Sequence, residues 1–69
     1  MQQQIYQDIG KQIKEVRESK GITQMELSNK LGFNQAYLSV LEGGKIRFSL
    51  EKLNQIVLAL ECKVNIKIV

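Results

Sequence analysis

The side chains with the clearest chemical use in this sequence are amides and hydroxyls that follow Gly32. Asn34 is a good N-cap, so we expect Gln35 to open a helix. The residues before and after Gly32 have the spacing of two short helices joined by a tight turn, a unit whose second helix enters the major groove of DNA. Side chains at the start of that helix reach the base edges, and a glutamine amide can bond both N6 and N7 of adenine. We therefore favour a base contact for Gln35 over a role as a solvated surface residue.

Other positions on the same face of this helix suit the same groove. Asn34 either contacts a base or only caps the helix, and Ser39 suits a base or a phosphate. Ala36 is suited to touch a thymine methyl group. Val40 suits a methyl contact as well, or it packs against the first helical segment. The candidate base contacts are therefore Asn34, Gln35, Ala36, Ser39 and Val40.

Four further residues are candidates for contacts with DNA phosphates. Gln24 lies in the first turn of an earlier helix, where its amide and the N-terminal backbone amides can hold a phosphate. Tyr37 either donates its hydroxyl to a phosphate, which we favour, or lies half-buried beside the core. Lys45 and Arg47 are expected to reach the DNA backbone, with ordinary loop charge as the alternative. For Glu42 we expect a structural role, bonding a backbone amide or a basic group.

The composition argues against catalysis and metal binding. The sequence has no histidine and a single cysteine, Cys62, which excludes an intramolecular disulfide and a His/Cys zinc site within one chain. Cys62 is interpreted as a buried small hydrophobic residue. No nucleophile has a plausible base beside it, and Gly43-Gly44 is a helix stop, not a phosphate-binding loop. We predict no enzymatic activity, no metal and no cofactor.

The length and charge indicate one small globular domain over residues 1–69. A core of this size is marginally stable alone, and oligomerisation is the remaining way to compensate. The net charge of +3 is too mild to prove nucleic-acid binding. The longest apolar run, residues 56–60, is far shorter than the about 20 residues of a membrane span, and no signal peptide is recognisable. We expect a soluble, cytoplasmic protein, nucleoid-associated when bound to DNA.

Apolar residues at helical spacing predict a long first helix and a shorter last one. Gly21 is expected to end the first helix, and Gly10 to weaken its start. Ser49 is expected to cap the last helix. The predicted apolar faces comprise Ile5, Ile9, Ile13 and Val16 in the first helix, and Leu50, Leu53, Ile56, Val57 and Leu60 in the last.

Between them, residues 23–42 have the pattern of a helix-turn-helix unit. Thr23 and Glu26 form a T-x-x-E capping box that opens a short helix, and Gly32 ends it. The next helix spans Gln35 to Glu42. In such a unit the first helix crosses the DNA backbone and the second enters the major groove. The residues expected to face inward are Leu27, Leu31, Leu38 and Leu41, and close packing of the two helices favours a small residue such as Ser28.

The tail changes period, because apolar residues alternate with polar ones from residue 62 to residue 68. Period two predicts a half-buried strand, and a lone strand needs a partner for its backbone groups. Pairing with a second copy about a two-fold axis is the simplest closed solution. We therefore expect a homodimer whose interface includes Val64, Ile66 and Ile68.

Residues 22–35 and 37–45 together resemble the Cro/CI-type (XRE) helix-turn-helix family. Three motifs match the pattern of this family: Thr-Gln-x-Glu-Leu at residues 23–27, Leu-Gly at residues 31–32 and Glu-x-Gly-Lys at residues 42–45. The resemblance implies a mainly α, lambda-repressor-like domain of four to five helices, followed here by the predicted C-terminal β-strand. Phe48 departs from the family, which often has proline before the last helix, and Ser28 stands where alanine is more usual.

The tail directly after the last helix looks like the terminal strand of HipB-type antitoxins, in which two such strands pair across the dimer. The resemblance implies a transcriptional repressor that binds an inverted-repeat operator in double-stranded DNA. It further implies an autoregulatory antitoxin with a HipA-like kinase toxin as partner. A stand-alone phage-type regulator or a restriction-modification controller is the alternative. A protein-interaction module without DNA binding is an alternative of another class.

Overall fold

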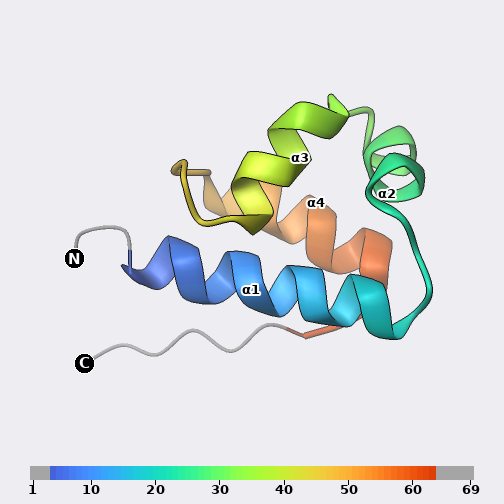
Figure 1. The fold of residues 1–69 in the computed structure, drawn as a ribbon, viewed down its shortest axis with the longest axis horizontal. Helices are drawn as coiled ribbons and strands as arrows, with labels where there is room; N and C mark the ends of the chain where they lie inside the picture. The colour runs from blue at the N-terminus through green and yellow to red at the C-terminus, as the bar shows by residue number, and fades with distance from the viewer. Residues whose placement is uncertain (1–3, 64–69) are drawn as a thin grey trace.

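The computed structural model describes residues 4–63, which form four α-helices (Figure 1). These helices are α1 (Gln4–Ser19), α2 (Gln24–Leu31), α3 (Gln35–Glu42) and α4 (Leu50–Leu60). In Figure 1, α1 runs along the lower side, α3 crosses above it, and α2 lies at one end. α1 and α2 each contact both α3 and α4, so all four helices share one core. The prediction of a mainly α domain of four to five helices is confirmed for the described residues, which form four.

The helix-turn-helix unit has the bounds and caps that its sequence predicts. The Thr23 hydroxyl accepts from the Glu26 amide and the Glu26 carboxylate accepts from the Thr23 amide, which completes the capping box. Gly32 ends α2 at φ +74°, a left-handed conformation that glycine adopts without a Cβ penalty. Asn34 caps α3 through its side-chain oxygen. Local capping chemistry therefore fixes both ends of the turn.

The last helix begins and ends where expected, although its apolar face is narrower. The Ser49 hydroxyl accepts from the Lys52 amide and caps the start of α4. Leu53, Ile56 and Leu60 are buried, whereas Leu50 is 76% exposed. The prediction that Leu50 belongs to the core face was therefore wrong. Leu50 is the first residue of the helix, one turn before Leu53, and its side chain lies beyond the packed helices.

The core is a single cluster of aliphatic side chains to which every helix contributes. Leu27 of α2 and Leu38 and Leu41 of α3 are almost fully buried, which ties the helix-turn-helix unit to the rest of the domain. Burial of each such side chain stabilises the fold by about 1.5–3 kcal/mol. Ser28 is also buried, and its hydroxyl donates to the Met25 carbonyl at 3.0 Å. Ser28 therefore faces the interior of the domain with its hydroxyl bonded.

The segment after α4 is described only as far as Lys63. Glu61 takes the left-handed conformation at φ +52°, and the Cys62 amide donates to the Val57 carbonyl, which closes the helix end. Cys62 packs half-buried against the core. Residues 4–63 contain no strand, and the predicted strand positions Val64, Ile66 and Ile68 lie outside the described residues. None of the helices within residues 4–63 is long and apolar enough to cross a membrane.

Gly10 allows α1 to pack closely against α3, a role that its low helix propensity does not predict. It lies in the middle of α1, where glycine weakens a helix, yet α1 is continuous from Gln4 to Ser19. A Cβ at Gly10 would lie 2.5 Å from the carbonyl oxygen of Leu41 and 2.8 Å from that of Glu42. The backbone of α1 therefore contacts the C-terminal end of α3 directly, and only glycine permits this approach.

We expect Gly10→Ala to destabilise the domain by about 1–3 kcal/mol, because the added methyl group forces two packed helices apart. The matched control is Gly43→Ala, since Gly43 has an ordinary φ of −76° and the nearest atom to its Cβ would be at 3.5 Å. This control is expected to be neutral or slightly stabilising. Urea denaturation measures both, and an equal effect of the two substitutions would contradict the close α1–α3 contact.

Candidate nucleic-acid interface

The outward face of α3 presents most of the predicted base-contacting residues to solvent. Leu38, Leu41 and Glu42 are buried on the inner side of the helix. The exposed residues of α3 are Gln35, Ala36, Ser39 and Val40, together with the cap residue Asn34. The Gln35 amide makes no hydrogen bond within residues 4–63, so its donor and its acceptor both remain available.

Asn34 has a role that the sequence left open between two alternatives. Its side-chain oxygen accepts from the Ala36 amide at 2.8 Å, which is the bond of an N-cap. The capping role is therefore confirmed. The bond uses one of the two lone pairs of the side-chain oxygen and holds the amide group at the helix N-terminus. The two NH₂ hydrogens of Asn34 remain as donors for a further partner.

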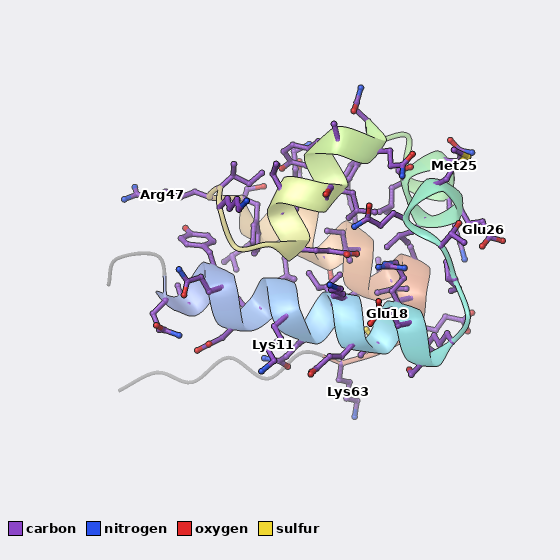
Figure 2. The ribbon with its side chains drawn as sticks, in the orientation of Figure 1. Lys11, Glu18, Met25, Glu26, Arg47 and Lys63 are labelled. Atoms are coloured by element: carbon purple, nitrogen blue, oxygen red, sulfur yellow. The ribbon has the colours of Figure 1, made fainter. Side chains whose placement is uncertain are left out.

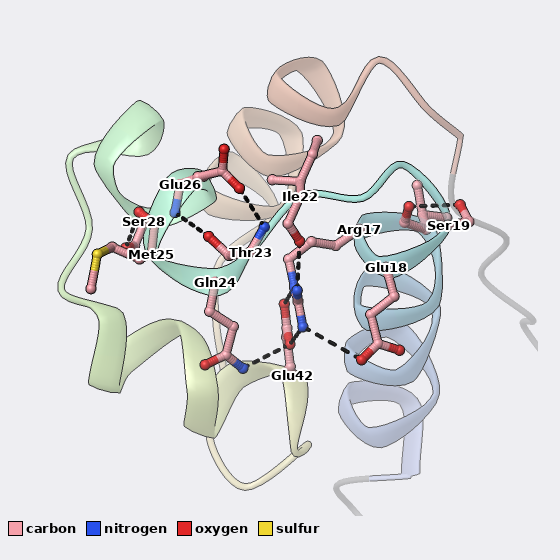
Figure 3. Close-up of polar contacts among 11 residues, drawn as sticks. Arg17, Glu18, Ser19, Ile22, Thr23, Gln24, Met25, Glu26, Ser28 and Glu42 are labelled. Carbon is pink, nitrogen blue, oxygen red and sulfur yellow. Dashed lines mark hydrogen bonds and ion pairs between the residues drawn. The ribbon is translucent and has the colours of Figure 1, made fainter.

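Gln24 and Glu42 lie together where the start of α2 meets the end of α3 (Figure 3). The Gln24 Nε2 group donates to Glu42 Oε1 at 3.0 Å, and the Gln24 side chain is half-buried. Its amide oxygen and second hydrogen remain for an outside partner. The structure therefore places the predicted phosphate contact in a fixed orientation rather than on a free surface side chain.

Arg17 is the partner of Glu42, and the sequence reasoning did not single it out. Arg17 Nε lies 2.8 Å from Glu42 Oε2, and Arg17 Nη2 lies 3.1 Å from Glu42 Oε1. A third bond joins Nη1 to the Ile22 carbonyl oxygen at 2.7 Å. Both residues are buried, at 6% and 5% exposure. The bidentate pair joins α1 to α3, and the third bond joins α1 to the segment that precedes α2. The structural role expected for Glu42 is therefore confirmed.

Two pKa shifts accompany these contacts. The pKa of Arg17 is raised mainly by its hydrogen bond with Glu42, and burial opposes this shift. The guanidinium therefore carries its charge at neutral pH. The pKa of the exposed Glu26 carboxyl is lowered, first by the bond from the Thr23 amide and then by the Thr23 side chain. Its part of the capping box is kept at neutral pH and is lost when acid protonates the carboxylate.

Tyr37 packs with Phe33 on the flank of α3 opposite to the one where Glu42 holds Gln24. Its ring packs edge-on against Phe33 with 5.5 Å between centroids, and both rings contact the core. Its hydroxyl makes no hydrogen bond within residues 4–63. Lys52 of α4 places its ammonium 4.7 Å from the Phe33 centroid and 5.6 Å from that of Tyr37. The sequence did not predict a role for Phe33 or Lys52 at this surface. They belong to segments that are distant along the chain and meet only when α4 packs against the helix-turn-helix unit.

The loop between α3 and α4 carries the two predicted basic contacts, and its backbone is held against α1. Lys45 and Arg47 are both exposed, and Figure 2 shows Arg47 extending away from the helices. A Cβ at Gly44 would lie 2.5 Å from the Cα of Gln7, so the loop touches the α1 backbone. Phe48 packs edge-on against Tyr6 at 5.0 Å. An aromatic contact with α1 thus holds the loop at the position where the Cro/CI-type family often has proline.

The outward face of α3 and its flanks form a surface suited to binding. An exposed helix face with free amide and hydroxyl groups is flanked by basic side chains of the loop and by Gln24. Within residues 4–63, no group of three or more His, Cys, Asp and Glu side chains comes together that could hold a metal ion. Such a face is complementary to the edges of bases and to phosphates.

Comparison with known proteins agrees with this geometry. The sequence model of one protein family, described as a helix-turn-helix domain, matches residues 2–69. The chain belongs to this helix-turn-helix family. The Cro/CI-type resemblance of its sequence is confirmed, and the protein is a DNA-binding helix-turn-helix regulator. No curated protein matches the chain.

Solved structures of regulators have the same fold. The restriction-modification controller protein C.AhdI from Aeromonas hydrophila is 26% identical with a TM-score of 0.78, covering 84% of this chain and 88% of the other. The controller C.Esp1396I, solved as a tetramer in complex with its natural 35 base-pair operator, is 27% identical with a TM-score of 0.80, covering 87% and 79%. An HTH_3 family transcriptional regulator from Vibrio cholerae is 24% identical with a TM-score of 0.82. The match covers 91% of this chain but only 35% of that regulator, and at this identity it shows the fold alone.

We expect Arg17→Met and Glu42→Gln each to destabilise this helix-turn-helix domain by about 3–5 kcal/mol, because each leaves one buried charge without its partner. The double variant is expected to lose clearly less than the sum, since it buries neither charge. Urea denaturation of all three variants measures the coupling. Glu18→Gln is the control, because Glu18 is exposed and 4.0 Å from Arg17. Strict additivity of the two buried substitutions would contradict the pairing.

Proposed function

We propose that this helix-turn-helix protein is a homodimeric transcriptional repressor that recognises an inverted-repeat operator in double-stranded DNA. α3 is the recognition helix and enters the major groove. Two such helices in a dimer reach successive major grooves about 34 Å apart. Bound at a promoter, the dimer represses transcription by excluding other proteins from that DNA.

The observation that carries this proposal is the exposed, unpaired amide of Gln35 at the start of a rigidly held helix. Asn34 fixes the N-terminus of α3, and Glu42 is fixed at its C-terminal end by Arg17. A side chain on such a helix loses little freedom on binding, because its backbone is already ordered. Gln35 therefore reads adenine, while Ala36, Ser39 and Val40 contact neighbouring bases and thymine methyl groups.

The phosphate contacts orient the helix in the groove. Gln24 already donates one hydrogen to Glu42 and offers the second to a phosphate, together with the amides at the start of α2. The Tyr37 hydroxyl, Lys45 and Arg47 contact the backbone around the same groove. Lys45 makes no ion pair with a carboxylate of residues 4–63, so its charge is available for DNA.

Two regulatory roles fit such a repressor. The likeness to C.AhdI and C.Esp1396I, over most of each chain, favours a controller-type regulator. The alternating apolar tail at residues 62–68 favours the second candidate, an autoregulatory antitoxin that pairs through its tail and binds a HipA-like kinase toxin. The two differ in their neighbours and partners. A kinase that co-purifies with the protein supports the antitoxin, and a neighbouring methyltransferase and nuclease pair supports the controller.

The operator is tested by mobility-shift titration against the DNA directly upstream of the protein's own gene. We expect tight binding that weakens with salt, and we expect Gln35→Ala to lose about 1–3 kcal/mol of discrimination against random duplex with little change in salt dependence. Replacing the contacted adenine should lower the affinity of the wild type for the operator but leave the affinity of Gln35→Ala unchanged.

Gln55→Ala is the matched control, because Gln55 is an exposed glutamine on α4 rather than on α3. It should bind like the wild type. Equal affinity of the wild type for upstream and random DNA would remove autoregulation. In a protein-interaction module without DNA binding, neither Gln35→Ala nor Lys45→Ala would change the binding that is measured.

Dimerisation through the tail is tested by replacing Val64, Ile66 and Ile68 together with threonine, and by truncation after Lys63. Both changes keep Cys62, which packs on the core, so the domain itself should remain folded. We expect a monomer in sedimentation analysis and an operator affinity lower by on the order of a hundredfold or more, because the two half-sites are no longer linked. Asn65→Ser is the control, and an unchanged dimer in the triple variant would place the interface elsewhere.

A further inference from the structure

We propose that Lys52, held over the rings of Phe33 and Tyr37, is a phosphate contact on the flank of α3 opposite to Gln24. This inference rests on the DNA binding proposed above and adds a residue from α4 to the interface. Lys52 belongs to neither the helix-turn-helix unit nor the basic loop, and its sequence position alone gives it no such role.

The ammonium of Lys52 is fixed by aromatic contacts. Its Nζ lies 4.7 Å from the centroid of Phe33 and 5.6 Å from that of Tyr37. The rings are themselves locked edge-on at 5.5 Å and pack against the core. The amide of Lys52 donates to the Ser49 hydroxyl, which fixes the backbone at the same point. Both ends of the side chain are therefore positioned before any ligand arrives.

The charge of Lys52 is not neutralised within residues 4–63, because it forms no ion pair with a carboxylate there. It also lies in the first turn of α4, where the positive end of the helix dipole disfavours a cation. The faces of aromatic rings offset part of this cost but leave the full charge in place. An uncompensated, positioned cation of this kind is suited to an anionic partner.

The position of Lys52 relative to α3 indicates which anion it meets. Leu38 and Leu41 face the core, and the residues on either side of them mark the two flanks of the exposed face. Glu42 lies on one flank and holds Gln24 there, whereas Tyr37 lies on the other and contacts Lys52. A helix in the major groove has one phosphate strand along each flank. Gln24 and Lys52 are therefore placed to contact opposite strands of the same groove.

The contact is tested by the salt dependence of binding, which counts neutralised phosphates. For a random-sequence DNA duplex and for the upstream DNA, we expect Lys52→Gln to lower the slope of log affinity against log salt by about 0.9 per subunit. Affinity should fall by a similar factor on both duplexes, because a phosphate contact carries no sequence information. Lys52→Arg should restore the slope, since it keeps the charge and the stacking on the rings.

Lys11→Gln is the matched control, because it removes the same charge from the side of α1 away from α3 (Figure 2). Its slope should equal that of the wild type. An unchanged slope for Lys52→Gln, with the wild type binding DNA and both variants folded by circular dichroism, would overturn the assignment of Lys52 alone. A wild type that binds neither duplex would overturn DNA binding itself and this contact with it.

Discussion

The buried pair of Arg17 and Glu42 is the interaction on which the arrangement of the interface depends. It joins the end of α1 to the end of α3 through two bonds of 2.8 and 3.1 Å, and a third bond from Arg17 fixes the chain just before α2. Burying two charges is favourable only when the geometry is good and the remaining polar atoms are bonded. Gln24 meets that requirement by donating to Glu42, and no buried side-chain polar atom of the described residues lacks a partner. The same contact that completes the ion pair therefore orients a side chain proposed to hold DNA.

Close backbone packing holds α3, the proposed recognition helix, against the rest of the domain. Gly10 brings α1 against the carbonyl groups at the end of α3, and Gly44 brings the following loop against Gln7. Because these contacts involve backbone atoms, they cannot relax by a change of rotamer. These contacts fix the orientation of α3 in a domain whose core is small. The helix therefore loses little conformational freedom when it binds.

The proposed interface surrounds α3 with contacts of two kinds. Exposed amide, hydroxyl and methyl groups on its outer face suit base edges, whereas Gln24, the basic loop and Lys52 suit phosphates on either side. The proposed phosphate contacts come from four segments, namely α2, α3, the loop after α3 and α4. Their relative positions therefore depend on the packing of α1 and α4 against the helix-turn-helix unit. In this proposal, specificity resides in a few residues of α3, and much of the affinity comes from the phosphate contacts on either side of it.

The sequence alone determined the helix bounds, the caps and the exposed face of α3. Capping by Thr23 and Asn34 and the turn at Gly32 depend on residues within four positions along the chain, so local patterns are sufficient to predict them. Only the tertiary structure decided that Arg17 meets Glu42, 25 positions away, that Gly10 is needed for close packing, and that Lys52 lies over Phe33 and Tyr37. These contacts join segments that are distant in sequence, and periodicity carries no information about which flank of one helix another helix covers. The exposure of Leu50 has the same origin, because an apolar residue is buried only where a neighbouring element reaches it.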